Sequence, residues 1–321
     1  MTAPRLQVRD LAVSIPVLGR HTLAVAGVSF SLDPGETLAL VGESGCGKSL
    51  TALGLSNLLP PNTRRERGEI LLDGQPLAAL GEEGWRAIRG RRIAMVFQEP
   101  QSALNPVMRL GDQVAEGIRA HTDVSWRSAR EAAVDALARV GIPDPKSRAR
   151  AYPHELSGGM KQRAVLAMAL AGNPGVLLAD EPTTALDVTV QAQILSLLRK
   201  LRDETGLSIL LVTHDLGVVA EAADRVAVMY AGRIVETGPV RQVLGDPTHP
   251  YTRGLKGSRP AAHETPLKPI PGQVPSSGNW PSGCPFHMRC EMANNVCESQ
   301  DQQLEVVKEK TYVACHVIIK K

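Results

Sequence analysis

This chain has few aromatic residues, no long hydrophobic run and no large excess of either charge. Phenylalanine, tryptophan and tyrosine together make up 3% of the 321 residues, and the formal net charge is +3. Because no run of about 18 uncharged apolar residues occurs, the sequence predicts no membrane-spanning helix. The near balance of charges gives no general reason to expect nucleic acid or acidic lipid as a partner.

The N-terminal residues also lack the pattern expected of a secretory signal. The opening residues MTAPRLQVRDLAV carry charge early and show no apolar segment followed by a small-residue cleavage site. We therefore expect a cytosolic protein. Apolar residues at 43% and charged residues at 21% are typical of soluble globular proteins, which excludes the disordered and fibrous classes.

Cysteine is rare as well, but its five residues are unevenly placed. Four of them, Cys284, Cys290, Cys297 and Cys315, lie in the last 38 residues. In a reducing compartment such clustering favours a metal site over disulfides. Their spacing matches neither zinc ribbons and fingers nor the common ferredoxin patterns. Zinc, an iron–sulfur cluster, and free or disulfide-linked cysteines therefore stay open at this point.

Several short apolar runs end in polar residues, and they predict the core of the fold. They are TLALVG at 37–42, RIAMVFQ at 92–98, GVLLADE at 175–181 and LSILLVTHD at 207–215. Continuous apolarity suits strands buried on both faces of a parallel sheet, with functional groups at their C-terminal ends. Helical patterns over 48–59 and 159–171 lie between them and stop at prolines, so the fold class is α/β.

The segment from about 99 to 155 predicts an inserted helical subdomain. Ala133, Leu137 and Val140 follow helical spacing there, and Gly141 then supplies a stop. Before residue 34, the stretches LQVRDLAVSI and LAVAGVSFSL predict short strands of an antiparallel layer.

The C-terminal part of the chain is unusually rich in proline. Ten prolines occur in the 47 residues from Pro239 to Pro285, which argues against regular helix or central strand there. We therefore predict two domains, 1–240 and a small appendage at 241–321.

The stretch GESGCGKS at 42–49 matches the phosphate-binding pattern G-x-x-x-x-G-K-[ST] between a predicted strand and a predicted helix. Its glycines let the backbone wrap around phosphates, Lys48 reaches the β and γ oxygens, and Ser49 can ligate Mg²⁺. The sequence therefore predicts a nucleoside triphosphate site. Its residues are Gly42, Glu43, Ser44, Gly45, Cys46, Gly47, Lys48, Ser49 and Leu50.

Polar residues at the ends of other predicted strands suit the same chemistry. Asp180 is the residue on the Mg²⁺ side, and Glu181 is placed to polarise an attacking water. His214 could contact a γ-phosphate, and Gln98 could contact Mg²⁺ or the water. The predicted catalytic residues are Glu181, His214 and Gln98, and the predicted Mg²⁺ ligands are Ser49, Gln98 and Asp180. Taken singly, each residue has an ordinary structural alternative.

A second anion-binding pattern, LSGGMKQR at 156–163, opens into a helix-forming run. Exposed backbone N–H groups and the positive end of a helix dipole favour an anion there. The chain holds one phosphate loop, whose own amides already surround the phosphates. A spare anion site makes sense if it is offered to a neighbouring chain.

The order of these motifs resembles the nucleotide-binding subunits of ABC transporters over about residues 4–240. The motifs are GESGCGKS, Gln98, LSGGMKQ, LLADEP, TALD and THD. The resemblance implies a RecA-like P-loop core with an antiparallel β layer and an inserted helical subdomain. It also implies that a signature of Ser157, Gly158, Gly159 and Gln162 contacts the γ-phosphate on the opposite subunit, with Asp187 in the D-loop. ATP then joins two chains, and its hydrolysis releases them.

Further segments resemble the dipeptide/oligopeptide importer branch over essentially the whole chain. They include NPVMRLGDQVAEGI, DEPTTALDVTVQAQIL, VMYAGRIVETG, HPYTRGL and the cysteine tail. The resemblance implies an ATP hydrolase on the cytoplasmic face of the cell membrane that powers peptide uptake. Nickel or other small-solute import, and a soluble ABC ATPase acting on nucleic acid, are the alternatives.

The same resemblance implies partners and cofactors. The partners are a related but different ATPase subunit, two permease subunits and, indirectly, an external peptide-binding protein, with no nucleic acid. The cofactors are ATP and Mg²⁺. Because importer subunits with this tail hold a [4Fe–4S] cluster, the resemblance favours such a cluster on Cys284, Cys290, Cys297 and Cys315 over zinc.

One position departs from the family pattern. Ile15 and Pro16 stand where an aromatic residue is expected to stack on adenine, and His21 is a possible substitute. We therefore predict modest discrimination between ATP and GTP.

Overall fold

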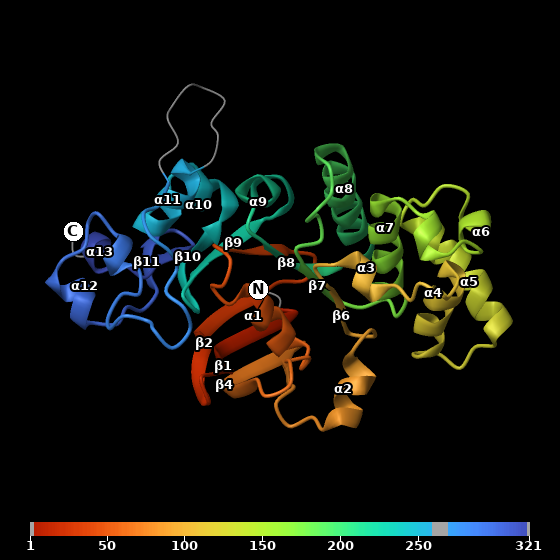
Figure 1. Cartoon of the computed structure of the whole chain (residues 1–321), viewed down its shortest axis with the longest axis horizontal. Coiled ribbons are helices and arrows are strands. Elements are labelled where there is room, and N and C mark those ends of the chain that lie inside the picture. The colour runs from red at the N-terminus through yellow and green to blue at the C-terminus, as the bar shows by residue number, and fades with distance from the viewer. Residues whose placement is uncertain (1–2, 259–268, 320–321) are drawn as a thin grey trace. The chain divides into compact units, whose positions relative to one another are not determined.

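The structure is a computed structural model that describes residues 3–258 and 269–319. Figure 1 labels the helices and strands of the chain, which divides into two compact units. The first unit is made of Met1–Arg5, Leu32–Glu36 and Ala79–Leu211. The second unit is made of Leu6–Ser31, Thr37–Ala78 and Val212–Lys321.

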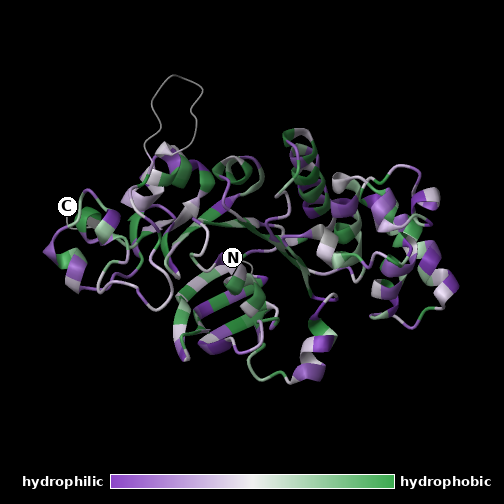
Figure 2. Ribbon diagram, in the orientation of Figure 1, coloured by the Kyte–Doolittle hydropathy of each residue, from purple (hydrophilic) through white to green (hydrophobic). Residues whose placement is uncertain are grey.

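A four-stranded sheet occupies the N-terminal part of the second unit. Its order is β2 (Arg20–Leu32), β1 (Leu6–Val17), β4 (Arg64–Leu72) and β5 (Gln75–Pro76). Strands β1 and β4 pair antiparallel, with Leu6 opposite Leu72. Buried and exposed residues alternate along parts of these strands, and Figure 2 shows hydrophobic and hydrophilic residues interspersed along them. One face of the sheet therefore packs on a core that includes helix α1 (Lys48–Leu55).

The second sheet of this unit carries the phosphate loop. Within this unit, five strands of the sheet lie in the order β11 (Glu305–Lys308), β12 (Thr311–Val313), β10 (Arg233–Pro239), β9 (Arg225–Tyr230) and β3 (Thr37–Val41). Strand β3 runs parallel to β9, and the other pairs are antiparallel. All five residues of β3 are buried, as predicted from its apolar run. C-terminal residues therefore extend the same sheet that positions the phosphate loop.

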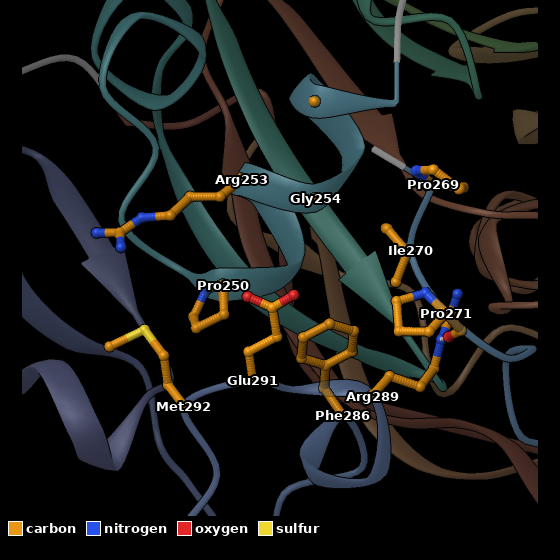
Figure 3. A pocket seen from close by; sticks show the side chains of 11 residues that line it. Pro250, Arg253, Gly254, Pro269, Ile270, Pro271, Phe286, Arg289, Glu291 and Met292 are labelled. Carbon is orange, nitrogen blue, oxygen red and sulfur yellow. Dashed lines mark hydrogen bonds between the residues drawn. The ribbon is translucent and has the colours of Figure 1, made fainter. Parts of the chain in front are cut away.

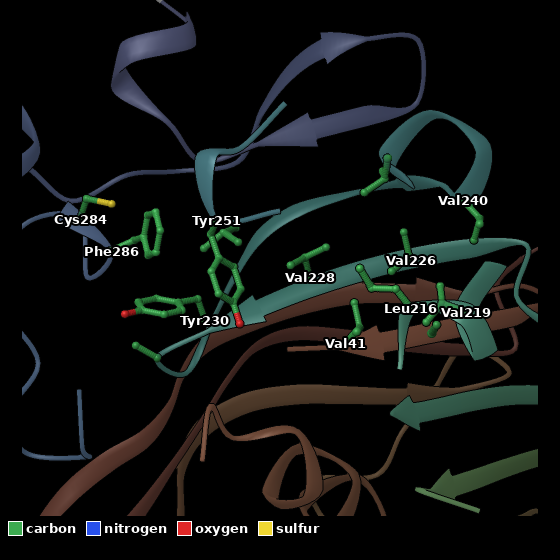
Figure 4. Packing of buried hydrophobic residues seen from close by; sticks show 14 of the residues in the cluster. Val41, Leu216, Val219, Val226, Val228, Tyr230, Val240, Tyr251, Cys284 and Phe286 are labelled. Atoms are coloured by element: carbon green, nitrogen blue, oxygen red, sulfur yellow. The ribbon is translucent and has the colours of Figure 1, made fainter. Parts of the chain in front are cut away.

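Helices of the second unit pack around this sheet. They are α9 (Leu216–Ala222), α10 (Val240–Gly245), α11 (Pro250–Gly257), α12 (Asn295–Ser299), α13 (His316–Ile319) and the 3₁₀ turn η2 (His287–Arg289). The core joins residues far apart in the sequence, among them Val41, Val228, Tyr251 and Phe286 (Figure 4).

The prediction that proline excludes regular helix between Pro239 and Pro285 is wrong, because α10 and α11 lie in this segment. Pro239 caps α10, and Pro250 is the first residue of α11. At a helix start the missing N–H has no partner to lose and the fixed φ angle already suits the helix. The position of a proline therefore matters more than the number of prolines.

The first unit combines parallel strands with most of the helices. Strands β6 (Ile93–Val96) and β7 (Val176–Asp180) pair parallel, and β8 (Ser208–Thr213), which begins in this unit, lies next to β7. The helices are α2 (Glu82–Ile88), α3 (Pro100–Ala103), α4 (Leu110–Arg119), α5 (Trp126–Arg139), α6 (Pro145–Arg148), η1 (Pro153–Glu155), α7 (Gly158–Ala169) and α8 (Val188–Thr205).

The apolar face predicted for the helical segment is confirmed. Ala133 and Leu137 are fully buried in α5, Val140 is buried just after it, and Gly141 has φ 73° at the stop. Helix α5 packs against α4 and α7. Within residues 3–258 and 269–319, every helix falls short of the length and apolarity that spanning a bilayer needs.

Candidate functional site

The loop from Gly42 to Ser49 leaves strand β3 and enters α1, and glycine is required at several of its positions. Gly45 and Gly47 have φ angles of 81° and 105°, which lie in the left-handed region that glycine adopts without steric cost. A Cβ atom on Gly42 would lie 2.1 Å from the carbonyl oxygen of Met229, so no larger residue fits there. The backbone is thereby free to curve closely around a ligand.

Lys48 is buried, and the loop itself holds its ammonium group. Its Nζ donates to the carbonyl oxygens of Gly42 at 2.7 Å and Glu43 at 3.0 Å. Cys46 is also buried, with its Sγ 3.9 Å from Lys48 Nζ. Burial raises the pKa of Cys46, although the positive charge of Lys48 acts in the opposite direction. The thiol therefore packs as a small neutral side chain beside the lysine.

The other predicted loop residues differ in exposure. Ser44 and Gly45 are exposed, whereas Ser49 and Leu50 are partly buried in the first turn of α1. Glu43 is partly buried and contacts residues from the C-terminal part of the chain, namely Tyr251 and Arg289. Sequence reasoning missed both contacts. The HPYTRGL motif was a signal for Tyr251, but nothing local singled out Arg289.

His214 lies in the short turn between β8 and α9, and its side chain is exposed. The turn is fixed on both sides of it. Thr213 Oγ1 accepts a hydrogen bond from the N–H of Asp215 at 3.1 Å, and Asp215 Oδ1 accepts one from the N–H of Gly217 at 2.7 Å. Asp215 therefore caps α9 and holds His214 at the strand end.

In the first unit, β7 ends in the two adjacent carboxylates that the sequence singled out. Asp180 is buried at the last position of the strand. Glu181 has φ 47°, a left-handed conformation that costs a residue with a side chain on the order of 1–3 kcal/mol. Its Oε2 accepts hydrogen bonds from Gln98 Nε2 at 3.1 Å and from Thr184 Oγ1 at 2.8 Å. The structure thus brings Gln98 and Glu181 together, and it adds Thr184, which sequence reasoning missed.

The signature segment forms the start of α7. Ser157 caps the helix, since its Oγ accepts a hydrogen bond from the N–H of Met160 at 3.4 Å. Ser157 and Gly158 are exposed, whereas Gln162 is buried. A Cβ atom on Gly159 would lie 2.7 Å from Val190 Cγ1, so glycine lets α7 approach α8 closely.

Asp187, predicted to belong to a D-loop, is the N-cap of α8. Its Oδ1 accepts a hydrogen bond from the N–H of Val190 at 2.9 Å. This side chain therefore has a structural role in its own chain, which the sequence pattern did not reveal.

The cysteine tail shows no site for a single metal ion. Within the described residues, no group of three or more histidine, cysteine, aspartate or glutamate side chains could hold one. The four thiols nevertheless lie near one another. The pKa of Cys284 is raised to about 11, chiefly by burial; a backbone hydrogen bond at Phe286 opposes this, and the charges of Cys297, Cys315 and Cys290 add smaller upward contributions. This arrangement gives no support to the zinc prediction or to the [4Fe–4S] prediction.

The HPYTRGL motif covers the start of α11, and several hydrogen bonds fix the chain there. His249 is buried, and its Nδ1 accepts a hydrogen bond from the N–H of Tyr251 at 3.0 Å. The buried carboxylate of Glu236 accepts hydrogen bonds from the N–H groups of Thr248 at 2.8 Å and His249 at 3.0 Å. The start of the helix is thereby fixed, and Tyr251 points to the phosphate loop.

Comparison with known proteins identifies the family of this chain. Residues 25–184 match the family described as ABC transporter, and residues 235–297 match the one described as oligopeptide/dipeptide transporter, C-terminal region. A peptide import ATP-binding protein of Brucella melitensis is 52% identical, with 92% of each chain covered. The oligopeptide transport ATP-binding protein OppD of Bacillus subtilis is 49% identical, with 96% of this chain and 87% of OppD covered. The chain belongs to the ABC transporter ATP-binding family.

Solved structures confirm the ABC ATPase P-loop fold. The ATP-binding cassette MJ0796, solved as a dimer bound to ADP and Pi, matches with a TM-score of 0.65 and 28% identity, covering 74% of this chain and 99% of MJ0796. The cbiO1 protein of Clostridium perfringens, part of the ABC transporter complex cbiONQ, matches with a TM-score of 0.66 and 29% identity, covering 76% of this chain and 91% of cbiO1. As an ABC ATPase, the chain binds and hydrolyses ATP.

Proposed function

We propose that this chain is the ATP-binding subunit of an ABC importer that takes up dipeptides or oligopeptides. The observation that carries the proposal is the identity of 52% and 49% to proteins named for peptide import, oligopeptide transport and dipeptide transport. The separate match of residues 235–297 to the oligopeptide/dipeptide transporter region supports the same substrate class. Nickel import is the alternative that a test must separate from it.

We also propose roles for the residues of the ATPase cycle. Gly42–Leu50 hold the triphosphate, and Ser49, Gln98 and Asp180 hold Mg²⁺. Glu181 polarises the attacking water, and the hydrogen bonds from Gln98 and Thr184 orient its carboxylate for this role. His214 contacts the γ-phosphate. The support is the order of the motifs together with the local geometry within each unit.

The signature, in this proposal, serves a second ATPase subunit. Ser157 and Gly158 are exposed at the start of a 12-residue helix, which suits them to an anion held by another chain. Gly159, Gln162 and Asp187 complete the contact region. The partner ATPase is a related subunit, and two permease subunits carry the pair on the cytoplasmic face of the membrane. An external binding protein delivers the peptide.

We propose the domain division at residue 240 as well. Residues 1–240 form the ATPase domain with its helical subdomain at about 99–155, and residues 241–321 form the extension typical of peptide importers. The match of the C-terminal family model to residues 235–297 supports a distinct C-terminal region.

The extension is further proposed to hold a [4Fe–4S] cluster on Cys284, Cys290, Cys297 and Cys315. A cubane cluster is larger than a single ion and tolerates wider ligand spacing, and the last 38 residues supply the four thiols that it needs. Such a cluster would supply a covalent cross-link between the tail segments. Protein purified without oxygen should contain iron and acid-labile sulfide and absorb visible light, and Cys290→Ser should lose all three while Cys46→Ser keeps them. Colourless protein with one equivalent of zinc would reject the proposal.

Reconstituted transport tests the main proposal. The tagged chain should copurify with a second ATPase subunit and two permease subunits, and proteoliposomes of this complex should accumulate labelled peptide when ATP and the binding protein are present. The same complex with Glu181→Gln should not. Accumulation of nickel in place of peptide would contradict the assigned substrate class.

A further inference from the structure

We infer that Arg289, which lies in the C-terminal extension, is a positioning residue for the phosphate loop. It orients Glu43 and neutralises its charge, and so keeps the loop ready for a triphosphate. The inference deepens the proposed function, since it rests on nucleotide binding at Gly42–Leu50. It makes the nucleotide site of this chain dependent on its C-terminal extension.

The contact joins the second residue of the phosphate loop to a residue 246 positions away. Arg289 Nη1 donates to Glu43 Oε2 at 2.8 Å, and Nη2 donates to Oε1 at 3.1 Å. Two parallel hydrogen bonds of this kind fix the orientation of a carboxylate as well as its position. The side chain of Arg289 is only 6% exposed and that of Glu43 is 30% exposed, so solvent screens the pair weakly.

Arg289 is itself held firmly by the extension and the core. Its Nε donates to the carbonyl oxygen of Pro271 at 2.7 Å, Nη2 donates to that of Gly272 at 3.4 Å, and Nη1 donates to Tyr230 Oη at 3.4 Å. Together with the two bonds to Glu43, these use all five N–H donors of a guanidinium group. A lysine cannot reproduce this set, because it has three donors and no planar fork.

Arg289 borders a cavity and lies near two aromatic rings. A cavity of about 290 Å³ lies beside it, lined by Pro250, Ile270, Pro271 and Phe286 among others (Figure 3). The guanidinium lies 5.7 Å from the ring centre of Tyr230 and 5.9 Å from that of Phe286. Arg289 is therefore fixed at the edge of this cavity by its hydrogen bonds and by its contacts with the two rings.

A second contact from the same region fixes the backbone of Glu43. The N–H of Glu43 donates to Tyr251 Oη at 2.9 Å. The ring of Tyr251 packs 4.6 Å from that of Tyr230 and 5.4 Å from that of Phe286 (Figure 4). The backbone and the side chain of Glu43 are therefore both anchored to one aromatic cluster.

The charge of Glu43 explains why the anchor affects nucleotide binding. A carboxylate beside a loop that binds a triphosphate adds negative charge where the ligand brings more. Paired with Arg289, this carboxylate is neutralised. The main-chain carbonyl of Glu43 also accepts a hydrogen bond from Lys48 Nζ at 3.0 Å. A displacement of Glu43 would therefore also displace the lysine that we propose to bind the phosphates.

A charge-neutral double variant separates this role from simple structural support. Arg289→Gln should weaken ATP binding by the full-length chain about tenfold, equivalent to about 1.4 kcal/mol, because Glu43 is left unpaired. Glu43→Gln combined with Arg289→Gln should recover most of the lost affinity, because the uncompensated charge is gone. Arg289→Lys should fall between the wild type and Arg289→Gln. Affinity is measured by calorimetric titration with ATP and Mg²⁺.

A matched control comes from another ion pair between core and extension. Arg233 on β10 pairs with Asp301 in the extension at 3.3 Å, and both side chains are partly or largely exposed. Arg233→Gln should leave ATP affinity unchanged. Thermal unfolding of each variant verifies that it is folded, and if Arg289→Gln fails to fold, Arg289→Lys and the double variant decide the question.

The outcomes are distinct. Unchanged affinity in Arg289→Gln overturns the inference, and so does a loss that the double variant fails to recover, since Arg289 would then act only as a structural support. If the wild-type chain itself fails to bind ATP, the proposed triphosphate site at Gly42–Leu50 fails. If it binds ATP and the variants match it, only the role of Arg289 is rejected.

Discussion

Glu181 combines an unfavourable backbone conformation with a carboxylate held by two donors, Gln98 and Thr184. A residue in such a conformation persists only where the surrounding structure enforces it, which is common at functional sites. The two hydrogen bonds orient the carboxylate without neutralising it. These features are consistent with a group that must face a water molecule in a defined direction.

Replacement of Glu181 tests this role. Glu181→Gln keeps the shape and the acceptor for Gln98 and Thr184 but cannot polarise water as a carboxylate does, so ATP hydrolysis should fall at least about 100-fold while ATP binding is retained. Phosphate release and nucleotide titration measure the two effects. Glu204→Gln, at an exposed position on α8, should hydrolyse ATP at the wild-type rate. Normal hydrolysis by Glu181→Gln would remove it as the catalytic residue.

His249 makes stability depend on pH. Burial lowers its pKa to about 3, the charge of Arg253 also lowers it, and a hydrogen bond to the carbonyl of Ala314 opposes both. Between about pH 6.5 and pH 3 the unfolded chain binds the additional proton, so this residue reduces stability as pH falls, by up to about 1.4 kcal/mol per pH unit.

The slope of stability against pH tests this expectation. His249→Asn keeps an acceptor for the start of α11, and its urea midpoint should change less between pH 7 and pH 5 than that of the wild type. His154→Gln, an exposed control, should keep the wild-type slope. Burial raises the pKa of Glu236, which has the opposite effect on stability, but that contribution is common to all three proteins. Equal slopes for His249→Asn and the wild type would show that His249 does not titrate in this way.

At the scale of elements, helix α8 begins at a residue with two possible roles. Asp187→Ala removes the N-cap and should cost about 1 kcal/mol of unfolding free energy, whereas Asp187→Asn keeps an equivalent cap. Urea unfolding measures both. If Asp187 also serves the D-loop, Asp187→Asn should lower ATPase activity at unchanged stability.

A residue near the C-terminal end of α8 supplies the control. Asp203→Ala, near the C-terminal end, removes an exposed carboxylate that pairs with the partly buried Arg202, and it should change stability by less than about 0.5 kcal/mol. Equal stability of Asp187→Ala and Asp187→Asn would show that the cap contributes nothing measurable.

Elements with strong local patterns could be predicted from the sequence. The continuous apolar runs became β3, β6, β7 and β8, because strands buried on both faces need no alternation. The phosphate loop was identified from its motif, and the structure explains both motif glycines: Gly47 has a left-handed φ angle, and Gly42 lies too close to Met229 to carry a side chain.

The extension shows where sequence reasoning failed. A count of prolines could not show that Pro239 and Pro250 would stand at helix starts. The partners of Glu43 lie 208 and 246 positions away, and no periodic pattern carries information over such separations. Thr184 was missed for another reason: it is the first residue of the TALD motif, but that motif was used only to assign Asp187, and its contact with Glu181 was not foreseen.

At the scale of the whole molecule, each chain has one phosphate loop and one signature, so a complete site needs two subunits in our proposal. Gly158 offers a test, because a Cβ atom there has Leu186 Cδ2 as its nearest neighbour at 3.8 Å, which is ordinary contact. Gly158→Glu should therefore fold normally and still bind ATP. In the Glu181→Gln background it should no longer associate with the partner ATPase subunit on addition of ATP, because its carboxylate repels the γ-phosphate. Light scattering measures the association.

Gly81→Glu is the control for this experiment, since a Cβ atom at Gly81 meets nothing within 4 Å. That variant should associate as Glu181→Gln alone does. ATP-driven association that survives Gly158→Glu would mean that the signature does not face the partner's nucleotide.

The pairing of β12 with β10 has a consequence for any shortened form of the chain. In the intact protein, Val313 lies opposite Glu236 and Tyr312 opposite Thr237, and the N–H of Ala314 donates to the carbonyl oxygen of Val235 at 2.9 Å. A chain that stopped at residue 240 would leave that strand edge bare, and bare edges recruit strands from other molecules. The last tenth of the polypeptide thus shields the catalytic sheet from self-aggregation, and shortened versions should precipitate even where their own core is sound.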